Sequence, residues 1–167
     1  MKAKKEIDGG ADKEEMFMRQ ALAEARKAES DGEVPVGAVV VRGGRVSSRG
    51  RNSSIHKNDQ TAHAEIVALR RASMKANNYR LEGSDLYVTL EPCAMCLGAA
   101  VHARIRRLVY GATDPKAGAV RSAMRFPLGK MNHRLLLREG VLAAECGGIL
   151  REFFRKKRAG DKPKTPG

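Results

Sequence analysis

Two short segments constrain this chain more than any other feature, because their side chains together form a set of metal ligands. The first is HAE at residues 63–65, and the second, after a gap of 26 residues, is PCAMC at residues 92–96. A catalytic zinc ion takes three protein ligands and keeps a fourth position for water. One imidazole and two thiols meet that need, so we expect the fold to bring His63, Cys93 and Cys96 to one point.

Glu65 lies two residues after the expected histidine ligand and is predicted to move protons rather than to bind metal. Burial raises the pKa of a carboxyl group, and a group with a pKa near neutrality both accepts and returns a proton. Zinc would lower the pKa of a bound water. The expected cycle is hydroxide attack on a carbon that bears an amino group, a tetrahedral intermediate, and loss of ammonia.

Two plainer interpretations of the PCAMC segment stay open at this point. A structural zinc site needs a further pair of ligands, and Cys146, the one remaining cysteine of three, stands alone. A redox dithiol has the same CxxC spacing but gives His63 and Glu65 no role. A catalytic zinc ion, one per subunit, accounts for all four residues.

Length and cysteine content predict a single domain in a reducing compartment. A chain of 167 residues suffices for one core, and three cysteines make no disulfide framework. The start, MKAKKEIDGG, has no apolar stretch, and no run approaches the roughly 18 apolar residues of a membrane span. We therefore expect a cytoplasmic protein with no membrane partner.

Positive charge gathers in the second part of the chain. The formal net charge is +13, of which residues 98–167 carry +11, with 16 basic and 5 acidic side chains. Such asymmetry indicates a polyanion such as nucleic acid, although a solvated helix face has the same composition. Aromatic residues make up only 4% of the chain, which argues against broad surfaces for stacking bases.

Hydrophobic periodicity predicts an α/β domain over residues 12–158, between disordered tails at 1–11 and 159–167. Strands alternate with helices, which favours helices on both faces of one five-stranded sheet. Thr61 is the expected N-cap of the second helix, and Pro92 marks the start of a helix that carries both cysteines. The expected strands are 36–41, 45–50, 85–90, 107–110 and 132–138. Besides the helix that begins at Pro92, the expected helices are 12–30, 62–76 and 142–158.

These motifs resemble the cytidine deaminase superfamily of zinc deaminases, and more closely its bacterial tRNA adenosine deaminases, which convert a wobble adenosine to inosine. The resemblance covers most of the chain from residue 13 to 158. It implies the three-layer α/β/α fold of that superfamily, with a mixed central sheet. The matching segments are VPVGAVVV (34–41), TAHAEIVALR (61–70), NYRLEGSDLYVTLEPCAMCLGA (78–99), RLVYGATDPKAGA (107–119), MNHR (131–134) and ECGGILREFFRKKR (145–158).

The resemblance also implies how the substrate is held. Asn52 and the backbone of Ala64 would contact the flipped nucleoside. The protein would be a homodimer that binds a tRNA anticodon stem-loop, with the C-terminal helix touching the loop. The residues in matching positions for RNA contact are Lys116, Phe154, Arg155, Lys157 and Arg158, although segment 120–130 departs from the family pattern.

Other functions remain as alternatives. A free-base or nucleotide deaminase, acting on guanine, cytosine or dCMP, would share the zinc motif but has no need of the basic C-terminal part. A non-catalytic RNA-binding subunit with a structural zinc has no use for Glu65. Glu91 is either a second catalytic carboxylate or, as we expect, a residue that supports the site or pairs with an arginine. Cys146 is expected in the core.

Overall fold

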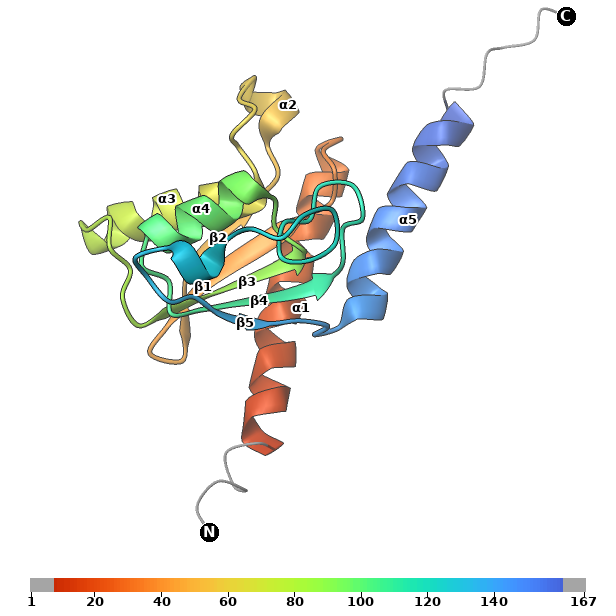
Figure 1. Ribbon diagram of the computed structural model, residues 1–167. Helices are drawn as coiled ribbons and strands as arrows, with labels where there is room; N and C mark the ends of the chain where they lie inside the picture. The colour runs from red at the N-terminus through yellow and green to blue at the C-terminus, as the bar shows by residue number, and fades with distance from the viewer. Residues whose placement is uncertain (1–7, 161–167) are drawn as a thin grey trace, which may run out of the picture.

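A five-stranded mixed sheet forms the centre of the computed structural model, which describes residues 8–160 (Figure 1). The strands lie in the order β2-β1-β3-β4-β5. β1 is antiparallel to both of its neighbours, whereas β3, β4 and β5 run parallel. The bounds are β1 Gly37–Arg42, β2 Arg45–Arg51, β3 Ser84–Leu90, β4 Arg107–Ala112 and β5 Leu136–Arg138.

Helices cover both faces of this sheet, which confirms the predicted three-layer α/β/α architecture. α3 and α4 lie on one face and α1 on the other. α5 packs through Cys146 against β3 and β4 beside α1, and the rest of the helix extends away from the body in Figure 1. In the part of the chain that the structure describes, no helix is long and apolar enough to cross a membrane. The helices are α1 Asp8–Ser30, α2 Ser54–Lys57, α3 Ala64–Ala76, α4 Ala94–His102, the short 3-10 helix η1 Leu128–Lys130, and α5 Ala143–Gly160.

Alternation along β1 explains why the sheet is buried on both faces. Successive side chains of a strand point to opposite faces. Ala38 and Val40 therefore pack in the core beneath α3 and α4, whereas Val39 and Val41 pack against α1. All four are at most 5% exposed, so this near-continuous apolar run is a central strand.

Most elements begin or end one or two residues from their predicted bounds, and α1, α5 and β5 differ in ways that affect the predicted tails and the sheet. α1 begins at Asp8, inside the segment expected to be a tail, and α5 continues to Gly160. The rest of the two predicted tails, 1–7 and 161–167, lies outside the described residues. The expected strand 132–138 forms only over Leu136–Arg138. Asn132 instead accepts hydrogen bonds from Arg104, which holds this stretch away from strand pairing.

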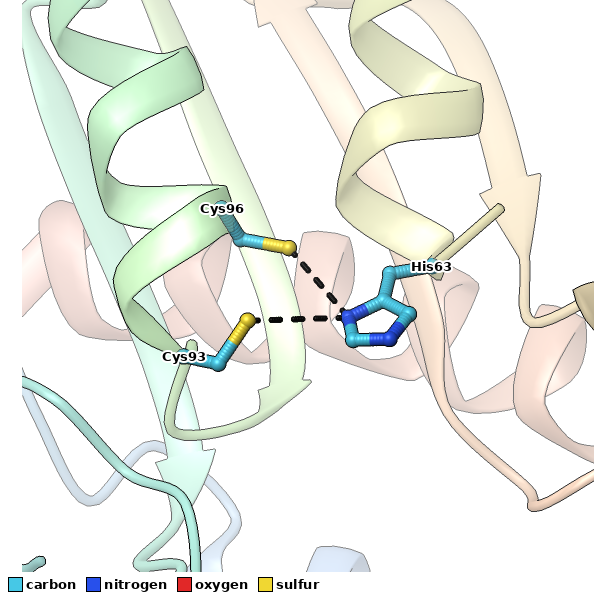
Figure 2. Close-up of side chains that lie close together, drawn as sticks. All are labelled: His63, Cys93 and Cys96. Carbon is cyan, nitrogen blue, oxygen red and sulfur yellow. Dashed lines mark hydrogen bonds between the residues drawn. The ribbon is translucent and has the colours of Figure 1, made fainter. Parts of the chain in front are cut away.

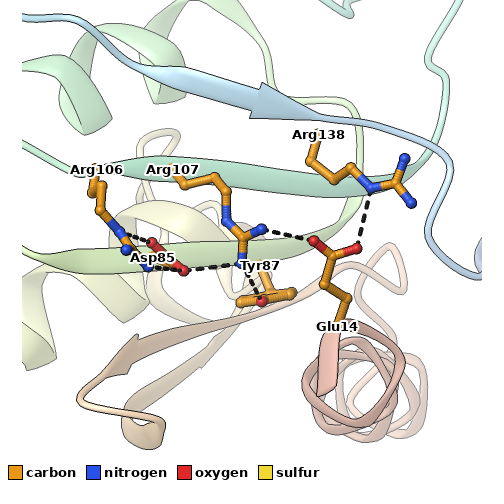
Figure 3. Close-up of polar contacts among 6 residues, drawn as sticks. All are labelled: Glu14, Asp85, Tyr87, Arg106, Arg107 and Arg138. Atoms are coloured by element: carbon orange, nitrogen blue, oxygen red, sulfur yellow. Dashed lines mark hydrogen bonds and ion pairs between the residues drawn. The ribbon is translucent and has the colours of Figure 1, made fainter. Parts of the chain in front are cut away.

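A charged network fixes α1 to the far edge of the sheet (Figure 3). Glu14 of α1 accepts hydrogen bonds from Arg107 of β4 at 2.7 Å and from Arg138 of β5 at 3.1 Å. Asp85 of β3 accepts two from Arg106, at 2.9 and 2.7 Å, and one from Arg107 at 3.1 Å. Because each carboxylate meets two arginines, the network ties one helix to three strands.

Gly50 allows the helix that carries the HAE segment to lie directly on β2. A Cβ at this position would come within 2.5 Å of the Ala68 backbone nitrogen and would overlap the Ala64 carbonyl oxygen. We therefore expect Gly50→Ala to lower the free energy of unfolding by about 3 kcal/mol, as overpacking against backbone does. Gly148→Ala is the matched control: it lies inside α5, meets only the end of a flexible arginine, and should stabilise by about 0.5–1 kcal/mol. Equal urea midpoints for the two variants would contradict this packing.

Candidate active site

Two helix starts place the predicted ligands side by side (Figure 2). His63 is the N-cap of α3 and Cys93 is the N-cap of α4, and both have extended backbone conformations. Cys96 lies in the first turn of α4, on the same side as Cys93. The prediction that Thr61 caps this helix is wrong. Thr61 instead donates its hydroxyl and its backbone N–H to Asp59, so the helix starts two residues later, at the histidine.

The distances between the donor atoms fit a tetrahedral metal ion. The Nδ1 atom of His63 lies 3.6 Å from the Sγ atom of Cys93 and 3.5 Å from that of Cys96. Zinc bonds of about 2.3 Å to sulfur and about 2.1 Å to nitrogen, in tetrahedral geometry, separate the two atoms by about 3.6 Å. The three donors all lie within 4.8 Å of one another, so the group is able to hold a metal ion.

The two thiols differ in how readily they lose a proton. Hydrogen bonds from the Cys96 thiol and from His63 lower the pKa of Cys93 to about 4. The hydrogen bond to Cys93 and burial raise the pKa of Cys96. One negative charge therefore forms easily in this pair, and metals bind thiolates rather than thiols.

Glu65 is buried beside the donor triad, at 4% exposure. Burial raises the pKa of its carboxyl group to about 7, and the charge of the nearby His63 opposes part of that rise. A carboxyl group with this pKa takes up and releases protons at neutral pH with little cost in either direction. The environment is therefore suited to the proton transfers predicted for Glu65.

Asn52 meets Ala64 directly. Its Oδ1 atom accepts a hydrogen bond of 2.9 Å from the Ala64 backbone N–H, which is the first N–H of α3. The His63 side chain makes no capping hydrogen bond. The side-chain amide of Asn52, which lies outside the helix, therefore caps α3 in its place. The two residues predicted to contact substrate thus form one polar unit beside the ligands, and their contact with a nucleoside stays a prediction.

A groove of about 1400 Å³ opens at the carboxyl ends of β3 and β4, next to the segment that carries the cysteines. Leu90 and Ala112, the last residues of these strands, line it. Its walls are α5 and the first part of the loop that follows β4, residues 113–122, here called the β4 loop. Four of the five residues predicted to contact RNA line this groove: Lys116, Phe154, Arg155 and Arg158. The fifth, Lys157, is not among the lining residues.

The same groove contains three arginines that the sequence interpretation did not single out. Arg121 comes from the β4 loop, Arg138 from β5 and Arg151 from α5. No linear motif connects them, because they are up to 30 positions apart in sequence and are brought together only by the fold. The groove is thus more basic than the terminal cluster alone indicated.

Glu91 and Cys146 are both buried, in different surroundings. Cys146 is fully buried against the sheet, as predicted. Glu91 is 2% exposed, and its carboxylate hydrogen-bonds within the β4 loop rather than to an arginine side chain. Burial raises the pKa of Glu91, but hydrogen bonds from the Arg121 backbone and from Ser122 outweigh it, so the pKa is lowered.

Comparison with known proteins agrees with this geometry over nearly the whole domain. The chain matches the MafB19-like deaminase family over residues 11–158. A tRNA-specific adenosine deaminase of Haemophilus influenzae is 54% identical, covering 87% of this chain and 85% of the relative. A solved structure described under A-to-I editing by tRNA:A34 deaminases at the wobble position is 49% identical, with a TM-score of 0.77, and covers 81% of this chain and 99% of its own.

The alternative free-base deaminases are more distant. A guanine deaminase from Nitrosomonas europaea has a TM-score of 0.74 but is only 24% identical, covering 83% of each chain. At that identity the likeness concerns the fold alone. Identity and coverage together therefore place this chain in the family of tRNA-specific adenosine deaminases.

Proposed function

We propose that this protein hydrolyses the wobble adenosine of a tRNA anticodon loop to inosine, using one zinc ion per subunit. The observation that carries the proposal is one of position. The donor triad follows the end of β3 that lines the large basic groove, because Leu90 lines that groove and Cys93 comes three residues later. A site for the reacting base and a surface for its phosphates are therefore adjacent.

His63, Cys93 and Cys96 would hold the zinc. The bound ion supplies an activated water for attack on C6 of adenine. Glu65 takes a proton from the attacking water and delivers it to N1 of the ring. It then takes the proton of the new C6 hydroxyl and delivers it to the departing amino group, so that adenosine and water become inosine, with its C6 carbonyl and N1–H, and ammonia. The buried position of Glu65 keeps bulk water from competing for these protons.

Asn52 is suited to the substrate side of this reaction. Its Oδ1 atom is engaged with the Ala64 N–H, which leaves its Nδ2 donors to face an acceptor on the nucleoside. The backbone of Ala64 would border the same base. An already unstacked anticodon loop costs only about a few kcal/mol to present a flipped base.

The groove would bind the phosphates around that base. Arginines and Lys116 fix a nucleic-acid backbone in place without reading its sequence, whereas the pocket around Glu65 selects the base. The exposed ring of Phe154, at 40% exposure, is placed to stack on a neighbouring base. Such a substrate belongs to the cytoplasm, where the thiols of the site also stay reduced.

One assay tests the proposal against its alternatives. Purified zinc-loaded protein is incubated with an anticodon stem-loop bearing a wobble adenosine and, in parallel, with adenosine, cytidine, dCMP and guanine. We expect inosine in the stem-loop and no turnover of the small molecules. Turnover of a small molecule with an intact stem-loop would establish a free-base or nucleotide deaminase instead. A protein that binds the stem-loop and converts nothing would be an RNA-binding subunit.

Neutralising Arg155, Lys157 and Arg158 together should weaken binding of the stem-loop and flatten its salt dependence. For a single strand, each phosphate that the protein ceases to neutralise lowers the slope of log K against log salt by about 0.7. Arg155 already pairs with Glu152, at 2.6 Å, so Lys157 and Arg158 should account for most of the change. Arg42 and Arg45 flank the β1–β2 turn at the opposite end of the sheet, and their double alanine variant is the matched control. If the triple variant and the control have the same slope of log K against log salt, the cluster does not contact RNA and is only a solvated end of the helix.

We also infer a homodimer, as the family resemblance implies. Large apolar side chains on the surface of one subunit support it, among them Ile55 at 67% and Met74 at 81% exposure. Light scattering should give a mass of twice the 18.2 kDa of one chain. A mass of one chain at micromolar concentration would contradict the inference.

A further inference from the structure

Glu91 makes an unusual set of contacts for a buried carboxylate. Its Oε1 atom accepts hydrogen bonds from three successive backbone N–H groups, those of Val120 at 3.1 Å, Arg121 at 2.9 Å and Ser122 at 3.1 Å. Its Oε2 atom accepts from the Asp114 N–H at 3.0 Å and from the Ser122 hydroxyl. All five donors belong to the β4 loop, so one side chain satisfies both ends of that loop.

This arrangement makes the carboxylate an internal anion around which the loop is wound. Successive N–H groups that converge on one oxygen form an anion-binding nest. Hydrogen bonds to an ionised acceptor are about twice as strong as neutral ones. The loop also approaches closely, because a Cβ at Gly118 would overlap the carboxyl carbon and Oε2 of Glu91. The shape of the β4 loop therefore depends on a charge that the loop itself does not carry.

The same residue connects the loop to the metal-ligand turn. Glu91 lies two residues before Cys93, and its own N–H donates to the carbonyl of Ala112 at 2.7 Å. Pro92, between them, accepts a hydrogen bond of 2.9 Å from the N–H of Ala119 in the β4 loop. The loop is thus bonded to two consecutive residues immediately before the first cysteine ligand.

The outer side of the loop faces the groove. Lys116, Ala117 and Arg121 line it opposite Phe154 of α5. Any RNA in that groove would meet a surface whose backbone is fixed by Glu91. From these contacts we propose that Glu91 is a positioning residue, which holds the β4 loop in the form that receives RNA. This role rests on the proposed function, because it concerns the RNA substrate of that same site.

Glu91→Gln tests the proposal with little change in size. The amide replaces one acceptor oxygen with an NH₂ group, which then faces backbone and hydroxyl donors. We expect KM for the stem-loop to rise about tenfold or more, since buried donors lose their partner, while kcat stays within about threefold and zinc stays at one per chain. Hydrogen exchange should quicken at the amides of residues 120–122, in the same zinc-loaded protein. A variant that is merely less stable would not separate KM from kcat in this way.

Gly118→Ala provides an independent variant with Glu91 intact. Its methyl group would displace the carboxylate from the loop and should reproduce both the KM and the exchange effects. Gly129→Ala, in η1, is the matched control, because a Cβ there meets nothing within 4 Å and both readouts should match the wild type.

The outcomes separate this role from the proposed function. If wild-type protein converts the stem-loop but Glu91→Gln shows an unchanged KM, or loses zinc and kcat instead, the positioning role is overturned and the function stands. If wild-type protein does not convert the stem-loop, the proposed function fails and the RNA role of Glu91 fails with it.

Discussion

Replacing Glu65 with glutamine is expected to lower kcat for inosine formation by about 10²- to 10⁴-fold, the usual contribution of a general acid and base. The side chain is buried next to the donor triad, and its pKa of about 7 suits it to both halves of the proton transfer. Glutamine has the same shape but neither accepts nor releases a proton at any working pH. The variant should therefore stay folded, bind the stem-loop and keep one zinc per chain.

A second buried glutamate, Glu24, lies away from the site and provides the control. Glu24 is 3% exposed, belongs to α1 on the opposite face of the sheet, and pairs with Lys27 and Arg51. Glu24→Gln should lose some stability, because its cations lose their partner, but should keep kcat within about twofold once folded. Single-turnover rates and zinc content, measured on both variants, distinguish a chemical role from a structural one. A Glu65→Gln enzyme with wild-type kcat would remove this residue from the mechanism.

Sequence reasoning located the candidate site because its signals are local. Cys93 and Cys96 are three residues apart, which places them in one helical turn, and the β-rich run before Pro92 marks the strand that precedes them. His63 required only that a second helix begin nearby. The sheet was equally accessible, since Val39 and Val40 belong to an apolar run too short for a helix and too continuous for an edge strand.

The features that were missed depend on contacts between distant segments. The start of α3 was misplaced because the acceptor for its first N–H comes from Asn52, twelve residues earlier, and not from Thr61. The strand expected from residue 132 is short because Arg104 holds Asn132 elsewhere. The role of Glu91 depends on a loop 23 to 31 positions away. No periodicity or spacing records such pairings, so only the folded arrangement exposes them.

Replacing Cys93 or Cys96 with alanine should abolish zinc binding, and with it all turnover. A site with three protein ligands that loses one retains only two. The loss of affinity should therefore far exceed the about 10- to 100-fold that follows from losing an outer partner of a ligand. Each variant should contain close to no zinc after dialysis, by elemental analysis, where wild-type protein contains about one per chain. The donor distances of 3.5 and 3.6 Å give both sulfurs an equal place in the site.

Cys146→Ala is the matched control for this experiment. Cys146 is as buried as Cys96, but it packs in the core near Gly111 and lies outside the donor triad. Its alanine variant should keep full zinc and full activity, with a modest loss of stability from the missing sulfur. Zinc retained in the Cys93 and Cys96 variants alike would refute the ligand assignment. If only one of the two variants loses zinc, only that cysteine is a zinc ligand. A different third ligand would then have to lie within reach of His63.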